Sequence, residues 1–275
     1  MNSRRPPVWL AHVVLLATAA LFVTPLVWMV LTSFKPAEQI TADPHRVLPV
    51  EWRAANYVDA VTTMPYFRYL RNSLVLCAGS VLGTLWSCSL AAYGFARLRW
   101  PLRDRVFGVL VATMLLPWHV TMIPRFLLLR ELGLYNTLGA LVVPTFLGDA
   151  FSIYLLRQFF LTIPEELSEA ARLDGCGEWR IFWRIVLPLA RPALATVALF
   201  QFIASWNDFN GPLLYLNDPS QFPLAYGLEQ FTSAYSSQTN LLMAAAVLFT
   251  LPIVILFFFT QRTFLRGIAA TGLKS

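Results

Sequence analysis

Residues 72–96 read NSLVLCAGSVLGTLWSCSLAAYGFA and contain no Asp, Glu, Lys or Arg. A helix needs about 20 mostly apolar residues to cross the hydrocarbon core of a bilayer. The stretch is long enough to do so, and it therefore predicts a transmembrane helix. The same criterion, applied outward from this stretch in both directions, decides the fold class of the whole chain.

The composition of the chain agrees with this prediction. Of its 275 residues, 57% are hydrophobic and only 13% are charged, which is about half the charged share of a soluble globular domain. So few charges could not cover the surface of a soluble protein of this size, and so much apolar surface excludes intrinsic disorder. The composition therefore indicates an integral membrane protein and argues against a free soluble enzyme.

Six stretches satisfy the criterion when single charges and prolines are tolerated, because neighbouring helices can satisfy the backbone groups that a proline frees. The first is longer than the roughly 7–15 apolar residues of a cleaved signal peptide, so it predicts an uncleaved anchor. We expect an all-α polytopic membrane protein with a single transmembrane domain over residues 1–275. The predicted spans cover about 9–32, 72–96, 106–124, 134–156, 192–213 and 240–261.

The basic residues predict the orientation of these spans. Cytoplasmic loops of membrane proteins carry an excess of Lys and Arg, and a cytoplasmic N-terminus places most of the 21 Lys and Arg residues inside. Both termini are then cytoplasmic, residues 33–70 form an outer segment, and residues 157–191 form a long cytoplasmic loop. Topology thus explains the net charge of +6, and no nucleic-acid partner is needed.

The cytoplasmic loop 157–191 is patterned like folded structure and unlike a simple linker. Thr162 and Glu165 have the spacing of a capping box at a helix start, and Gly175 fits the left-handed residue that often ends a helix. A second short helix is predicted over about 178–186, ending at Pro188.

The first of these two helices carries Leu167, Ala170 and Ala171 at the spacing of one helical face. The loop is either a surface helix pair that packs on its own bundle or a docking element for a cytoplasmic partner. The residues by themselves leave both interpretations open.

One pattern in this loop resembles a known family. Glu169-Ala170-Ala171, then Gly175, Ile185 and Leu187-Pro188 match the EAA signature of ABC-importer permeases at every fixed position. The wider chain is similar to carbohydrate-uptake permeases, in particular the shorter, maltose-type second subunit. Further similar stretches are Asn56-Tyr57, Asn72-Ser73, Ala92 to Arg97, Pro117, Pro124, Gly133 to Thr137, Phe151 to Phe160, and Trp206 to Phe209.

The resemblance implies the fold of a type I ABC-importer permease in a bacterial cytoplasmic (inner) membrane. It implies that the loop forms a coupling helix in a cleft of the ATP-binding subunit, where Glu169 pairs with a basic residue and Gly175 allows a sharp turn. The C-terminal segment 262–275 is a weaker contact candidate. The residues implied in coupling are Glu165, Glu169, Ala170, Ala171, Asp174, Gly175, Ile185, Leu187 and Pro188.

The same resemblance implies a set of partners. They are a second permease subunit that completes a heterodimer, two copies of a cytoplasmic ATPase, and a periplasmic or lipid-anchored solute-binding protein. The expected function is to translocate a carbohydrate (a sugar, an oligosaccharide or a polyol), driven by ATP hydrolysis in the separate subunit. A permease for a sugar phosphate or glycerol phosphate is the alternative within this class.

No nucleotide-binding motif is found in the chain. A Walker A loop needs Gly before its Lys, but Phe34 precedes Lys35 and Leu273 precedes Lys274. We therefore expect no enzyme activity and no cofactor in this chain, with ATP and Mg²⁺ used by the partner ATPase. HExxH and CxxC are also absent, so no metal site is predicted. An intramembrane lipid-modifying enzyme is the alternative from another class, but His119 and Asp149 are too few for a catalytic set.

The expected solute path rests on polar residues inside spans. An ionisable residue in a bilayer is costly and usually faces a cavity or a partner, which favours Asp149 on the solute path or in a hydrogen bond between spans. The alternative is an interfacial Asp close to the cytoplasmic end of the span. The fifth span is short and interrupted by Gly211-Pro212, a pattern that points to binding sites in transporters. An aromatic belt is the alternative, and in maltose-type systems sugar contacts can fall mainly on the partner. The tentative path residues are Asp149, Ser205, Trp206, Asn207, Asp208 and Asn210.

Overall fold

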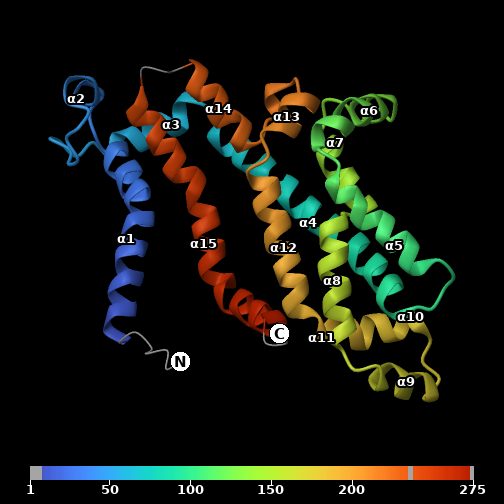
Figure 1. Ribbon diagram of the computed structural model, residues 1–275. Coiled ribbons are helices and arrows are strands. Elements are labelled where there is room, and N and C mark those ends of the chain that lie inside the picture. The colour runs from blue at the N-terminus through green and yellow to red at the C-terminus, as the bar shows by residue number, and fades with distance from the viewer. Residues whose placement is uncertain (1–7, 235–237, 273–275) are drawn as a thin grey trace. The chain divides into compact units, whose positions relative to one another are not determined.

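The computed structural model describes the backbone of residues 8–234 and 238–272, and the side chains of residues 8–229 and 238–261. Within these residues the chain forms helices joined by turns and extended segments (Figure 1). The helices, with η marking 3₁₀ or π turns, are α1 Val8–Ser33, α2 Ala37–Ala42, α3 Ala55–Thr63, α4 Tyr66–Arg97, α5 Arg103–Ala112, η1 Thr113–Leu115, α6 Trp118–Glu131, α7 Gly139–Val142, η2 Val143–Leu147, α8 Ala150–Thr162, α9 Glu166–Leu173, α10 Glu178–Ile181, η3 Phe182–Val186, α11 Leu187–Leu189, α12 Arg191–Trp206, α13 Asn210–Tyr215, η4 Pro219–Gln221, α14 Leu224–Ala234 and α15 Thr239–Gly272.

Four helical segments of the described chain are long and apolar enough to cross a membrane. They are residues 8–33, 66–97, 139–162 and 239–261, and two bent helix pairs raise the number to six if each pair is one span. The pairs are 103–115 with 118–131, bent by 101°, and 178–189 with 191–206, bent by 78°. The prediction of an all-helical polytopic membrane protein is confirmed.

The third predicted span, 106–124, is not one straight helix. Its backbone leaves the helical region at Leu116, whose ψ is 117°, and α6 starts after Pro117. A residue that precedes proline is pushed out of the α region because the proline ring clashes with its backbone. Pro117, which was expected to lie inside one continuous span, therefore separates two helices, whereas α1 and α15 continue through Pro25 and Pro252.

The chain divides into two compact units. The first consists of residues 1–66 and 228–252, and its described part is held by a buried amide. Asn56 Nδ2 donates to the carbonyl oxygens of Ser33 (2.8 Å) and Lys35 (2.9 Å), while Asn240 Nδ2 donates to Asn56 Oδ1 (3.1 Å). These contacts tie the end of α1 to α3 and to the start of α15.

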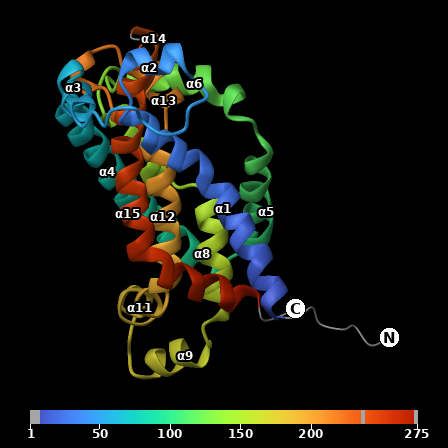
Figure 2. The same ribbon diagram turned by 90° about the vertical axis from the view of Figure 1, so that its left-hand side faces the viewer.

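The second unit consists of residues 67–227 and 253–275. Its core gathers apolar residues from α4, α8, α9, α10 to η3, and α12, among them Cys88, Phe160, Ile181 and Val197. In Figures 1 and 2, α9 and α11 lie at one end of this unit, beyond α8 and α12. The core therefore extends to the loop 157–191 and gives that loop a rigid base.

Candidate functional site

The first helix of the loop, α9, starts differently from the prediction. The capping box of Thr162 and Glu165 is wrong, because Thr162 is still the last residue of α8 and its hydroxyl donates to Phe159 O (2.7 Å). Glu165 makes no capping hydrogen bond with its side chain and instead lies 3.6 Å from Arg99. The apolar sequence before Thr162 continues α8 to this point, so the hydroxyl is used inside that helix.

The end of α9 agrees with the prediction. Gly175 has φ +79°, a conformation that only glycine adopts at little cost. Its N–H donates to Arg172 O (3.0 Å), and the next N–H, of Cys176, donates to Ala171 O (2.9 Å). This pair of bonds is the Schellman motif, which satisfies the last carbonyls of a helix. The predicted C-cap at Gly175 is confirmed.

Most side chains of α9 point away from the second unit. Ser168 and Ala171 are its buried residues, whereas Leu167 is 44% exposed and Leu173 is 90% exposed. Leu167, Ala170 and Ala171, whose spacing predicts one helical face, therefore differ in burial, since Ala170 is also exposed. Glu169 and Asp174 are exposed as well, so α9 presents apolar and acidic side chains away from its own unit.

The second helix of the loop is longer than predicted. It runs through α10, the π turn η3 and α11, and it continues past Pro188 to Leu189. Proline lacks the N–H that an α-helix needs at that position, and the π turn lies in the residues just before it. Ile185 and Leu187 pack against the buried core, which anchors this helix to the second unit.

A charged contact that the sequence analysis missed joins the loop to α4. Glu178 accepts hydrogen bonds from the Tyr93 hydroxyl (2.5 Å, to Oε2) and from Arg172 Nε (2.7 Å, to Oε1). The Arg172 guanidinium holds the pKa of the Glu178 carboxyl below its usual value. Four residues along α4, Arg97 Nη2 donates to Phe160 O (2.7 Å) and to Ile163 O.

These contacts place three elements around Glu178: Tyr93 belongs to α4, Arg172 to α9, and Glu178 starts α10. The stretch Ala92 to Arg97 contains both Tyr93 and Arg97 at helical spacing, and this spacing was the available sequence signal. The pairing of Tyr93 with Glu178 spans 85 positions, so local pattern alone could not have assigned it.

Asp149, the first of the tentative path residues, starts a helix. It precedes α8, and its side chain accepts the Ser152 N–H (2.8 Å), which is the bond of an N-cap. Its own N–H donates to Cys88 Sγ (3.2 Å), and Gly148 before it has φ +94°. The fourth predicted span is therefore divided at this residue into α7 with η2 and α8.

The other path residues lie where the fifth span breaks. The α12 helix ends at Trp206 and α13 begins at Asn210, so the break precedes Gly211-Pro212. The expectation that these two residues make the break is wrong, because both lie in the first turn of α13, where proline's missing N–H does no harm. Asp208 Oδ1 accepts the Gly211 N–H (3.0 Å), so Asp208, like Asp149, supports a helix start.

The polar side chains around this break differ in exposure. Ser205 and Trp206 are buried. Gln201 Nε2 donates to Ser205 Oγ (2.9 Å), and the Trp206 ring stacks on Phe202 with centroids 5.6 Å apart. Asn207 and Asn210 are exposed, which leaves them accessible to a solute or to another subunit.

The family described as binding-protein-dependent transport system inner membrane component matches residues 79–270, which is more than half of the chain. The chain belongs to this family. It is therefore a multi-pass inner-membrane permease subunit of a binding-protein-dependent ABC importer, and the ATPase is a separate component. The expectation that this permease is not itself the ATPase is confirmed by the family.

Named relatives extend over nearly the whole permease. The diacetylchitobiose uptake system permease protein NgcG of Streptomyces coelicolor is 31% identical over 92% of this chain and 84% of its own length. The sn-glycerol-3-phosphate transport system permease protein UgpE of Yersinia pestis bv. Antiqua is 31% identical over 98% of both chains.

A solved structure shares the permease fold. A chain of a bacterial ABC transporter involved in the import of the acidic polysaccharide alginate superposes with a TM-score of 0.81 at 25% identity, covering 95% of this chain and 98% of its own. The fold expected from the EAA-like pattern is thus confirmed over almost the full length.

Proposed function

We propose that this permease translocates a carbohydrate (a sugar, an oligosaccharide or a polyol) into the cytoplasm and couples to its ATPase through α9. The observation that carries the coupling role is the exposed face of α9, with Leu173 90% exposed and Glu169 exposed beside it. Apolar side chains left uncovered on a soluble loop mark an interaction surface. Glu169 then supplies the charge that a basic residue of the ATPase pairs with.

The other coupling residues divide by burial in this proposal. Ala170 and Asp174 lie on the exposed side with Glu169, and Glu165 borders it. Ala171, Ile185 and Leu187 belong to the base, Pro188 is exposed, and Gly175 makes the turn between the two helices. The tail 262–275 stays a weaker candidate, and its side chains lie outside the described residues.

The proposed assembly contains a second permease subunit, two copies of the ATPase and a periplasmic or lipid-anchored solute-binding protein. ATP and Mg²⁺ are used by the ATPase, and this chain holds no cofactor. Carbohydrate as the solute class is supported by the uptake system named for the relative NgcG. Glycerol phosphate is the second candidate, which the relative UgpE supports at similar identity.

The coupling role is tested with the complete transporter in proteoliposomes. Glu169→Ala should strongly reduce uptake and the ATPase activity stimulated by loaded binding protein, while membrane insertion stays normal. Glu166→Ala is the matched control, because Glu166 is also exposed in the first turn of α9 but lies outside the EAA pattern. Equal activity of the two variants would refute the role of Glu169.

The solute class is tested separately, by measuring which compounds the cognate binding protein binds. Neutral sugars or oligosaccharides are expected. Binding of glycerol phosphate alone would replace the carbohydrate proposal and leave the coupling proposal intact.

A further inference from the structure

A basic cavity lies at the turn between α4 and α5, and two of its residues, Arg99 and Asp104, form ion pairs with the loop 157–191. Its volume is about 540 Å³, and its lining contains three arginines and a single acidic residue; the lining residues are Arg99, Trp100, Leu102, Arg103, Asp104 and Arg105. The coupling proposal does not use this cavity. An excess of guanidinium groups in a cavity favours an anionic ligand, because Arg pairs with phosphate through two parallel hydrogen bonds.

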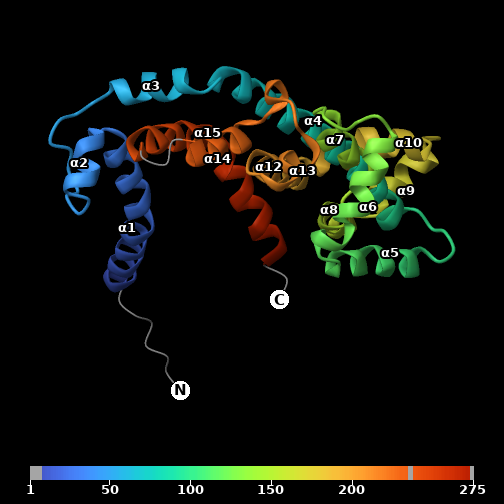
Figure 3. The ribbon, with the colours of Figure 1, turned by 90° about the horizontal axis from the view of Figure 1, so that it is seen from above.

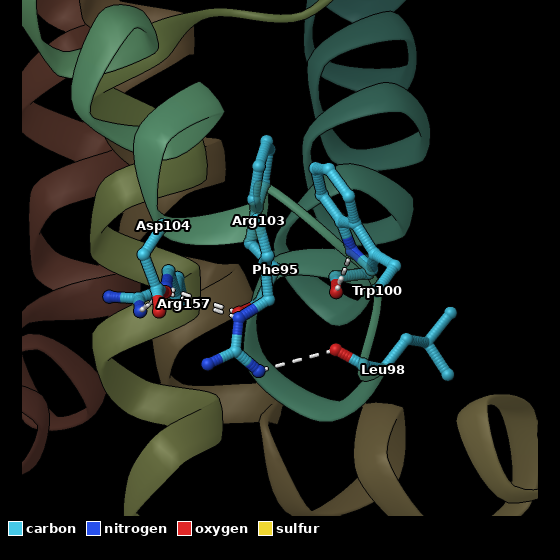
Figure 4. A network of polar contacts seen from close by, with 7 residues as sticks. Phe95, Leu98, Trp100, Arg103, Asp104 and Arg157 are labelled. Atoms are coloured by element: carbon cyan, nitrogen blue, oxygen red, sulfur yellow. Dashed lines mark hydrogen bonds and ion pairs between the residues drawn. The ribbon is translucent and has the colours of Figure 1, made fainter.

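The acidic residue of the cavity is already neutralised by neighbours. Arg103 Nε lies 3.2 Å and Arg157 Nη2 lies 3.7 Å from Asp104 Oδ1. Arg103 also donates to Leu98 O (3.2 Å), and the Arg157 guanidinium lies 4.1 Å from the centre of the Phe107 ring. Figure 4 shows Arg103 and Arg157 converging on this corner. The carboxylate is thus occupied and does not cancel the remaining arginines.

Two arginines of the cavity are left to meet a ligand. Arg105 is exposed, and no ion pair forms to it among the described side chains. Arg99 has a side chain that is 86% exposed, and its contact with Glu165 is 3.6 Å long. An ion pair this exposed contributes little, so Arg99 can turn toward an anion in the cavity.

The helix that leaves the cavity is apolar and uncovered. No described residue of α5 is buried, and Val106 and Val109 are 44% and 67% exposed, as is Leu102 at 60% before the helix. The α5 helix packs beside α8 at the rim of the second unit (Figure 3). Because this rim belongs to a predicted membrane span, lipid acyl chains are the natural solvent of its apolar side chains.

The cavity contains Trp100, a residue type that is typical of the membrane interface. Its indole Nε1 donates to Gly94 O (3.2 Å), and its ring packs on Phe95 with centroids 5.6 Å apart. Tryptophan is enriched at the headgroup level of bilayers. A cationic cavity at this level, continued by an exposed apolar helix, matches a molecule with an anionic head and two acyl chains.

We propose that this cavity binds the phosphate headgroup of an anionic phospholipid, with the acyl chains lying along α5. Basic pockets beside membrane helices on the cytoplasmic side bind such headgroups through charge and hydrogen bonds. Arg99 and Arg105 contact the phosphate, and Arg103 is held by Leu98 and Asp104 as the wall of the site. The proposal rests on the membrane location of the chain and does not require α9 docking; its one link to α9 is the exposed contact of Arg99 with Glu165.

The test uses the complete transporter, purified in detergent and titrated with phosphatidylglycerol, with bound lipid counted by native mass spectrometry. The double variant Arg99→Gln with Arg105→Gln should lose about 30-fold in apparent affinity, since each Arg near an anionic surface contributes about 1 kcal/mol. The double variant Arg180→Gln with Arg184→Gln is the control. Both arginines are exposed and are predicted on the same cytoplasmic side of the membrane as Arg99 and Arg105, and the change in net charge is equal.

Two further arms separate the possible ligands. Phosphatidylcholine should bind no tighter to the wild type than to the double variant, and inorganic phosphate should not displace phosphatidylglycerol, because it lacks acyl chains. Displacement by inorganic phosphate would show a free-anion site and overturn the lipid proposal. Unchanged lipid binding in the double variant would also overturn the lipid proposal. If that variant kept its lipid but lost the ATPase subunit, the arginines would form a protein contact instead. Size-exclusion chromatography confirms that each variant still assembles.

Discussion

Replacing Gly175 tests the geometry of the loop most directly. At φ +79°, a residue with a Cβ atom loses about 1–2 kcal/mol relative to glycine, because the Cβ approaches the following carbonyl oxygen. A Cβ built at this position meets no atom within 4 Å, so the penalty comes from the backbone alone. We therefore expect Gly175→Asn to be mildest, Gly175→Ala intermediate and Gly175→Val most severe, since Asn tolerates this conformation and a branched residue does not.

The conformational penalty sets the expected loss of affinity between the permease and its ATPase. If the native turn is required for docking, 1–2 kcal/mol corresponds to at most about a 5- to 30-fold weaker apparent affinity of the permease for its ATPase. The assay measures association of the purified ATPase with the permease complex in nanodiscs, together with transport-coupled ATP hydrolysis. Gly177→Ala is the matched control, because Gly177 has φ −74° and also has open space around its Cβ position.

Two results would contradict this reasoning. If Gly175→Ala and Gly177→Ala behave alike, the left-handed turn has no bearing on coupling. If Gly175→Val couples as well as Gly175→Asn, the effect does not follow the backbone strain from which the series is predicted. Normal membrane insertion of all four variants is the condition for either conclusion.

Three further predictions concern contacts within the second unit. Tyr93→Phe should cost about 1.5–3 kcal/mol by removing a hydrogen bond to a charged carboxylate, and a double-mutant cycle with Glu178→Gln in thermal unfolding should be non-additive. The pKa of Glu178 is lowered in the folded protein, so its contribution to folding stability is complete above the ordinary pKa range of carboxyl groups and is lost as the pH falls through the lowered pKa. The difference in stability between wild type and Glu178→Gln should therefore be constant near neutral pH and shrink only in acid. Gly211→Ala should cost about 1–3 kcal/mol in the same measurement, since its Cβ would lie 2.4 Å from Asp208 Oδ2, whereas Gly108→Ala, with open space, should be neutral or stabilising.

The membrane class and the C-cap of the loop were predictable because each depends on local sequence. A charge-free run decides whether a helix can cross a bilayer, and only glycine meets the demand for a left-handed residue at 175 without strain. Neither feature depends on which residues pack nearby. The helix end at Leu116 was also local, since a residue before proline avoids the α region, but the apolar composition around it hid the break.

The remaining site features depend on tertiary contacts. Thr162 fits a capping box by spacing, yet α8 continues through it. Asp208 is isolated in an apolar span by sequence, yet it supports the start of α13 by accepting the Gly211 N–H. The Tyr93 contact with Glu178 joins positions 85 apart, and such pairings follow from helix packing, which single-sequence patterns do not encode.

The distribution of burial in the loop favours one of its two original interpretations. A helix pair that only covers its own bundle would bury its large apolar residues, because leaving a leucine in water forgoes about 1.5–3 kcal/mol. The second helix buries Ile181 and Phe182 while exposing Trp179 and Trp183. By contrast, α9 exposes both of its leucines, Leu167 and Leu173, and buries only Ser168 and Ala171. An anchored helix beside an uncovered one favours docking, and the Glu178 contact gives a displacement of α9 a direct route to α4.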